Sequence, residues 1–154
     1  MSPVLALVGF VGLCLLVSAA DGAIIAGSAR GWYLSLTRPI GTPPTWLFGL
    51  TWAGVHLMIG VAGWLVWRRS TATRPLRLWG WQLAANAVWA PAFFAMHSPL
   101  LAIVVNLVLL GLIASTAHAF TGVRRSAAWL LGPYFAWTGY VTYLTIGFWW
   151  LNPI

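Results

Sequence analysis

Long apolar stretches separated by short polar segments organise this chain. Five of them, at about residues 3–26, 46–67, 76–96, 100–121 and 127–150, are long enough to cross a bilayer. A helical crossing takes about 20 residues. Because these runs are continuously apolar rather than alternating, they predict helices and not the strands of a membrane β-barrel. The predicted fold is an all-α membrane protein, a bundle of five transmembrane helices that forms one domain over residues 1–154.

The connection between the first two stretches, at about residues 27–45, is the longest in the chain. It contains Pro39, Pro43 and Pro44, each of which fixes its own φ and so stiffens the segment. Loops of this length are often lids. We therefore expect a lid over a site at this end of the bundle, with Arg30 and Arg38 placed to contact carboxylates of a ligand.

The charge distribution predicts an orientation. Only 6% of the residues are charged, against 61% that are hydrophobic, and all eight basic residues are arginines. Six of them follow the second and fourth stretches, so both arginine-rich turns fall on one side, which the positive-inside rule makes cytoplasmic. This predicts a multi-pass protein of the bacterial cell membrane with a cytoplasmic N-terminus, and no nucleic-acid partner. A signal peptide cleaved near Ala20 is the alternative for the first stretch, although no basic residue precedes it.

Twelve tryptophans are unusually many for a chain of 154 residues. Most fall near the predicted membrane interfaces, where indoles form aromatic belts. These are Trp32, Trp46, Trp149 and Trp150 at one interface and Trp64, Trp67, Trp79, Trp81 and Trp129 at or near the other. Trp52, Trp89 and Trp137 fall deeper, on three different helices. An indole N–H in hydrocarbon needs a partner or a cavity, so these three indicate either helix packing or a pocket.

Polar residues at the same depth favour a pocket. His56 lies one turn after Trp52 on the same face. On the third stretch, a single face carries Gln82, Asn86, Trp89 and Phe93. Polar groups in lipid turn inward because exposure there is costly. An aromatic wall with a few hydrogen-bonding groups is typical of a site for a flat apolar ligand.

Four motifs resemble those of the tryptophan-rich sensory protein (TspO/MBR) family, which includes the translocator protein or peripheral benzodiazepine receptor. The motifs, in chain order, are Trp32-Tyr33-x-x-Leu36-x-Arg38-Pro39 with Pro43-Pro44, then Trp52, then Gln82-Leu83-Ala84-x-Asn86-x-x-Trp89-x-Pro91-x-Phe93-Phe94, and finally Pro133-Tyr134-x-x-Trp137. The resemblance covers nearly the whole chain.

The resemblance implies a five-helix bundle, often a homodimer, that binds porphyrins such as protoporphyrin IX or haem. In some members it implies cholesterol or synthetic benzodiazepine-type ligands, and it implies no obligatory cofactor. Tyr33, Trp52 and Trp137 match aromatics linked to porphyrin binding and light-dependent breakdown, which makes them the only catalytic candidates. Pocket-lining positions match Asn86 and Phe93. With these, the expected ligand-binding set includes His56, Trp89 and Val141.

Three departures from the family pattern change these expectations. Gly41 stands where the family commonly has a tryptophan, so one wall of the site is expected to be missing. His56 replaces a tyrosine and could ligate haem iron. Ile146 and Trp150 occupy the tyrosine and arginine positions of the cholesterol motif, which argues against a sterol ligand.

The favoured function is a porphyrin-binding sensor or carrier in tetrapyrrole or stress regulation. A porphyrin-degrading enzyme, a b-type cytochrome with His56 and His118 as ligands, a proton-coupled transporter and a purely structural protein are the alternatives. Asp21 is the only acidic residue, so carboxylate-dependent mechanisms and metal sites find little support. Gly80 and Ala84 form a small-xxx-small pair that suits a dimer interface. The bacterial or mitochondrial outer membrane is the alternative location.

Overall fold

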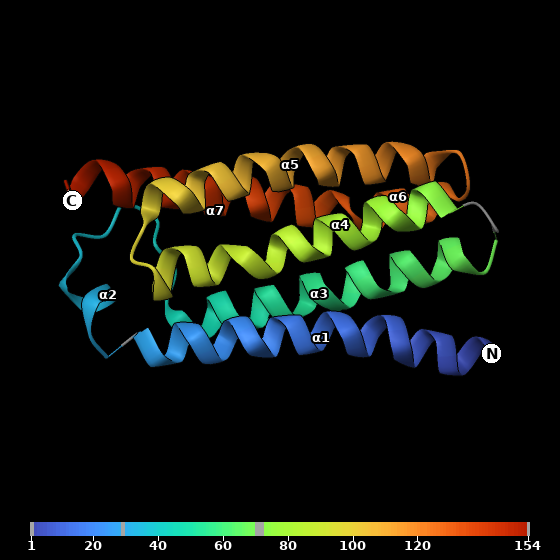
Figure 1. The fold of residues 1–154 in the computed structure, drawn as a ribbon, viewed down its shortest axis with the longest axis horizontal. Coiled ribbons are helices and arrows are strands. Elements are labelled where there is room, and N and C mark those ends of the chain that lie inside the picture. The colour runs from blue at the N-terminus through green and yellow to red at the C-terminus, as the bar shows by residue number, and fades with distance from the viewer. Residues whose placement is uncertain (1, 29, 70–72, 154) are drawn as a thin grey trace.

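The structure is a computed structural model that describes residues 2–28, 30–69 and 73–153, and every regular element in these ranges is helical (Figure 1). The elements in chain order are α1 (Pro3–Ser28), α2 (Trp32–Ser35), α3 (Thr45–Trp67), α4 (Thr73–Ala90), the π-helical segment η1 (Pro91–Ala95), α5 (Pro99–Thr121), α6 (Arg125–Leu130) and α7 (Gly132–Leu151). The long helices lie side by side along the long axis of the molecule. The all-α fold class is confirmed.

Two of the predicted elements differ in the structure. The single helix expected over residues 127–150 is instead two helices, α6 and α7, with a break at Leu131. Pro133 lies in the first turn of α7, where its missing N–H prevents a continuous ladder of hydrogen bonds through this region. The expected lid, residues 27–45, contains the short helix α2, and its Ala29 lies outside the described residues.

Helix α4 does not end as a regular α-helix but continues into the π-helical segment η1. Pro91 begins this segment and cannot donate a backbone hydrogen bond. The wider turn is closed by the Met96 amide, which donates to the Pro91 carbonyl oxygen at 2.9 Å. Both Phe93 and Phe94 are buried in this turn. Such π-turns recur at functional sites because they redirect side chains.

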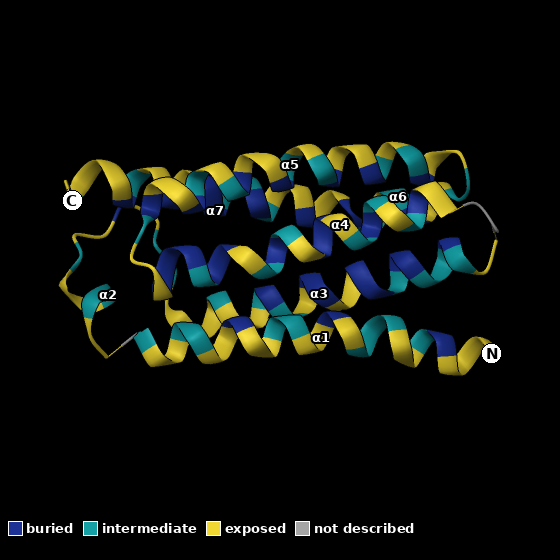
Figure 2. Ribbon diagram, viewed as in Figure 1, coloured by how far each residue is buried: buried dark blue, intermediate teal, exposed yellow. Residues whose placement is uncertain are grey.

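Three helices of the described chain, α1, α3 and α5, are long and apolar enough to cross a membrane. Their outer faces expose large aliphatic side chains such as Leu16 and Leu107, and the exposed face of α1 runs along its length (Figure 2). A surface of this composition would be unstable in water but suits contact with lipid. The chain is therefore a membrane protein.

The two ends of the bundle differ in character. At one end lie the N-terminus and the connections from α3 to α4 and from α5 to α6 (Figure 1). At the other end lie the C-terminus and the segment between α1 and α3 that contains α2, called the α2 loop below. Six arginines belong to the first end. Its core contains Trp79, which is 6% exposed and donates to the Ile59 carbonyl oxygen at 2.9 Å. The expectation that Trp79 belongs to an interfacial belt is therefore wrong, because Gly63 leaves room for its ring inside the bundle.

Candidate ligand pocket

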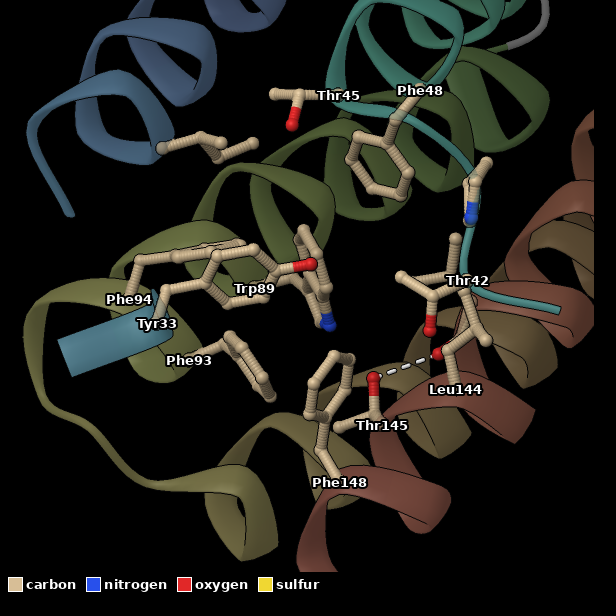
Figure 3. Close-up of a pocket in the computed structure, with 13 residues that line it drawn as sticks. Tyr33, Thr42, Thr45, Phe48, Trp89, Phe93, Phe94, Leu144, Thr145 and Phe148 are labelled. Atoms are coloured by element: carbon tan, nitrogen blue, oxygen red, sulfur yellow. Dashed lines mark hydrogen bonds between the residues drawn. The ribbon is translucent and has the colours of Figure 1, made fainter. Parts of the chain in front are cut away.

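An aromatic-lined pocket lies beneath the α2 loop (Figure 3). This loop is at the end of the bundle away from the arginine-rich turns (Figure 1). Its volume is about 40 Å³. It is lined by Ile25 of α1, Tyr33 of α2, Thr42 and Pro43 of the loop, Thr45 and Phe48 of α3, Trp89, Phe93 and Phe94 of α4 and η1, and Val141, Leu144, Thr145 and Phe148 of α7. The lining is mostly apolar, with a few hydroxyl groups and one indole, which suits a flat apolar ligand.

The π-helical segment and α7 supply half of the aromatic wall, namely Phe93, Phe94 and Phe148. Trp89 stacks almost parallel to Phe93, with ring centroids 6.0 Å apart, while Phe94 meets Trp89 edge to face. Phe148 packs against Phe93 at 5.4 Å and against Tyr33 at 5.6 Å. The segment η1 thus directs the side chains of two consecutive phenylalanines towards the same cavity. In a regular α-helix, neighbouring side chains point about 100° apart.

The loop over the pocket is fastened to α7 by hydrogen bonds. The Thr37 amide donates to Asn152 Oδ1 at 2.8 Å, and Asn152 Nδ2 donates to the Thr37 carbonyl oxygen at 3.0 Å. Further along the loop, the Tyr143 hydroxyl donates to the Ile40 carbonyl oxygen at 3.1 Å, and the Tyr140 hydroxyl donates to Gly41. The loop therefore has a defined conformation above the pocket and is held against α7 by these hydrogen bonds.

Gly41 has a conformational reason to be glycine. Its φ is +90°, in the region that side chains rarely adopt, and its carbonyl accepts the Tyr140 hydrogen bond. A tryptophan at this position would strain the turn. Gly41 therefore closes the loop in a conformation that favours glycine, fixed by the hydrogen bond from Tyr140.

Tyr33 and Arg38 form the polar edge of the cover. The Arg38 guanidinium carbon lies 5.3 Å from the centroid of the Tyr33 ring, at the distance of a cation–π contact. Burial raises the pKa of the Tyr33 hydroxyl, and the charge of Arg38 opposes that rise. Arg38 and Arg30 are exposed and do not line the pocket. They are placed to meet only a ligand group that projects from the pocket.

Behind the pocket wall, His56 is buried in a hydrogen-bonded network. Its Nδ1 lies 2.9 Å from the Trp52 carbonyl oxygen and its Nε2 lies 3.1 Å from Asn86 Oδ1, while Asn86 Nδ2 lies 2.8 Å from the Tyr134 hydroxyl. A neutral imidazole donates through one nitrogen only. The O and N atoms of the Asn86 amide are nearly isosteric and can be exchanged. After the exchange the amide nitrogen donates to His56 Nε2 and the amide oxygen accepts from the Tyr134 hydroxyl, so every group in this network has a hydrogen-bond partner. Both nitrogens of His56 are then engaged, which leaves neither free for haem iron.

Three indoles meet at this depth, those of Trp52 and Trp89 buried and that of Trp137 partly buried. The ring centroid of Trp52 lies 6.1 Å from that of Trp89 and 6.4 Å from that of Trp137. In the part of the chain that the structure describes, the Nε1 atoms of all three are buried without a hydrogen-bond partner. Unpaired buried donors are costly unless a ligand or water reaches them. The indole nitrogen of Trp89 faces the hollow of the pocket (Figure 3).

The predicted site residues divide into two groups in the structure. Tyr33, Pro43, Trp89, Phe93 and Val141 line the pocket. Of the others, Trp52, His56 and Asn86 lie behind its wall, Trp137 packs against Phe48 at 5.5 Å, and Pro44 is exposed as the residue that precedes α3. His118 is exposed near the end of α5, whereas His56 is in the core. The two histidines therefore do not form a pair of axial ligands.

Several lining residues were not among the predicted site residues. Leu144, Thr145 and Phe148 follow Val141 at i+3, i+4 and i+7, and so share one face of α7. This spacing was the signal that could have found them. Phe48 lies one turn before Trp52 on α3, a spacing that could also have found it. Thr42 carries no such signal, because the fold of the loop decides where it lies.

The fold and the pocket together define a helical membrane protein with an aromatic-lined cavity under a structured loop. The sequence profile of the TspO/MBR family matches residues 10–151. A tryptophan-rich protein TspO of Chlorobaculum tepidum is 34% identical over 147 residues, which cover 93% of each chain. The translocator protein of Homo sapiens is 35% identical over 130 residues, or 81% of this chain and 77% of that one. Protein CrtK of Rhodobacter capsulatus is 30% identical over 138 residues, or 87% and 85% of the two chains.

The chain belongs to the TspO/MBR family. The resemblance drawn from the four motifs is thereby confirmed.

Proposed function

We propose that this protein binds a porphyrin, such as protoporphyrin IX, in the pocket under the α2 loop and acts as a sensor or carrier of tetrapyrroles. The observation that carries the proposal is the pocket itself: aromatic rings from α2, α3, η1 and α7 surround one cavity. Flat aromatic ligands stack favourably on such rings. Arg38, beside Tyr33 at the edge of the cover, is the nearest candidate to pair with a propionate group.

The size of the pocket adds a requirement to this proposal. A cavity of about 40 Å³ is far below the roughly 300–1,000 Å³ of pockets that hold drug-sized ligands. Binding a porphyrin therefore requires the loop to lift from α7. We propose that the hydrogen bonds at Thr37, Ile40 and Gly41 hold the closed state. Opening of the loop then limits the rate at which a ligand enters.

The proposal includes a membrane arrangement. All five long helical units, namely α1, α3, α4 with η1, α5, and α6 with α7, cross the bilayer. The arginine-rich end faces the cytoplasm of a bacterial cell, following the positive-inside rule. Gly80 and Ala84 lie on an accessible part of α4, with open space around Gly80, and are offered as the contact in a homodimer.

Titration of the purified protein with protoporphyrin IX in the dark tests the proposal, with tryptophan fluorescence and porphyrin absorbance as readouts. Trp89→Phe should weaken binding about five-fold or more, because it removes a stacking indole worth about 1 kcal/mol. The matched control is Trp81→Phe, since Trp81 is 66% exposed and lies outside the pocket. Equal losses in both variants, or no saturable binding by the unmodified protein, would refute the pocket as the porphyrin site.

A second candidate activity is light-dependent breakdown of the bound porphyrin. The observation that favours it is the contact between the rings of Trp52, Trp89 and Trp137, which offers oxidisable groups next to the pocket. Repeating the titration under illumination tests it. Loss of porphyrin absorbance that depends on Trp52 and Trp137, at unchanged affinity in the dark, would support an enzyme rather than a carrier.

A further inference from the structure

An open groove lies at the other end of the bundle, lined by residues of α5, α6 and α7. Its volume is about 570 Å³. Small residues create it: Ala114 and Ala117 of α5 face Ala128 of α6 and Gly132 of α7. A Cβ atom added to Gly132 would meet nothing within 4 Å. The groove is therefore a hollow of the outer surface that neighbouring side chains leave unfilled.

Two of the lining side chains suit the headgroup region of a membrane. Arg125 begins α6, and Trp129 follows one turn later on the same side of the helix. Trp129 is 79% exposed, the exposure expected of an indole at the membrane–water interface. The rest of the wall is almost entirely apolar, including Ile113 and Phe135. The groove thus combines one cation and one interfacial indole with a hydrocarbon-like interior.

No acidic side chain of the protein is suited to neutralise Arg125. The sequence contains eight arginines and one acidic residue, Asp21. Asp21 is 1% exposed and belongs to the second half of α1, towards the pocket end. The neighbouring guanidinium of Arg124 is directed to the Ser126 hydroxyl, to which its Nε donates at 2.9 Å. The counter-charge of Arg125 must therefore come from outside the chain.

We propose that this groove binds one anionic phospholipid, with the phosphate on Arg125, the headgroup beside Trp129 and an acyl chain in the apolar groove. Charge complementarity selects an anionic headgroup. The apolar walls select an occupant with a hydrocarbon chain, which a free phosphate ion lacks. Basic pockets between membrane helices commonly hold anionic lipids. The site is separate from the aromatic pocket, so it is independent of the porphyrin proposal.

Quenching of tryptophan fluorescence by brominated acyl chains tests this site in vesicles. Mixed vesicles of phosphatidylglycerol and phosphatidylcholine carry bromine on one lipid or the other. The contribution of Trp129 is the difference between the unmodified protein and Trp129→Phe. We expect this contribution to favour brominated phosphatidylglycerol over brominated phosphatidylcholine by roughly five-fold. Quenching of the remaining indoles checks that each variant is folded.

Three variants separate a built site from a general effect of positive charge. Arg125→Gln should reduce the preference to near one, whereas Arg69→Gln should leave it unchanged, because Arg69 is exposed at the same end but does not line the groove. Gly132→Leu should reduce Trp129 quenching by both lipids, since its side chain would occupy the groove.

Several results would overturn the proposal. Equal losses in Arg125→Gln and Arg69→Gln would show a diffuse charge effect. Displacement of brominated phosphatidylglycerol by inorganic phosphate would show an anion site rather than a lipid site. An absence of any Trp129 quenching by either lipid would show that the groove is covered, for example by a second copy of the chain.

Discussion

The seat of the loop on α7 can be disturbed by adding a single methyl group at Gly147. A Cβ on Gly147 would lie 2.6 Å from Cβ and 3.0 Å from Cγ of Pro39, a buried residue of the loop. Pro39 would have to move until this distance reaches at least the 3.4 Å of ordinary contact. The rigid proline ring cannot rotate away, so the loop itself must shift. Overpacking of this kind typically costs about 1–3 kcal/mol.

Gly139→Ala provides a matched control on the same helix. A Cβ at Gly139 meets nothing within 4 Å, so both variants share the effect of replacing a helical glycine and only Gly147→Ala adds the clash. We expect Gly147→Ala to unfold more readily than Gly139→Ala by about 1–3 kcal/mol. Hydrogen exchange over residues 37–42 should be faster by about five-fold or more.

These measurements do not depend on the ligand. If Gly147→Ala and Gly139→Ala showed the same exchange over residues 37–42 and the same stability, the loop would not rest on α7 as described. A faster dissociation of protoporphyrin IX from Gly147→Ala would add that the loop controls release of a ligand from the pocket.

Three further changes test the core and the surface of the bundle. Gly63→Ala should destabilise the protein by about 1–3 kcal/mol in thermal unfolding, because the added Cβ would lie 2.7 Å from the Trp79 ring. The control is Gly54→Ala, whose Cβ would meet nothing within 4 Å, and equal stability of the two variants would contradict the prediction. Asn86→Leu should cost about 1–3 kcal/mol by leaving His56 without its Nε2 partner, and a double-mutant cycle with His56→Phe should recover part of that loss. Ala84→Leu should weaken a dimer measured by cross-linking in detergent, whereas an unchanged dimer would place the interface elsewhere.

The helical class and the inward faces follow from sequence periodicity. Continuous apolar runs of about 20 residues can satisfy their backbone groups in lipid only as helices. On the third long helix, the spacing of Gln82, Asn86, Trp89 and Phe93 predicted one buried face, and all four side chains are buried. The arginine positions likewise predicted that the two basic turns lie together, as they do in the structure.

The tertiary structure alone decided which buried residues face the pocket and which face one another. Asn86 and Trp89 share a helical face, yet Asn86 contacts His56 and Tyr134 while Trp89 lines the cavity. The spacing of residues fixes their directions around one helix axis, to within the period of 3.6. It does not fix how that helix is rotated against its neighbours. That rotation depends on packing between helices, such as the space that Gly63 leaves for Trp79.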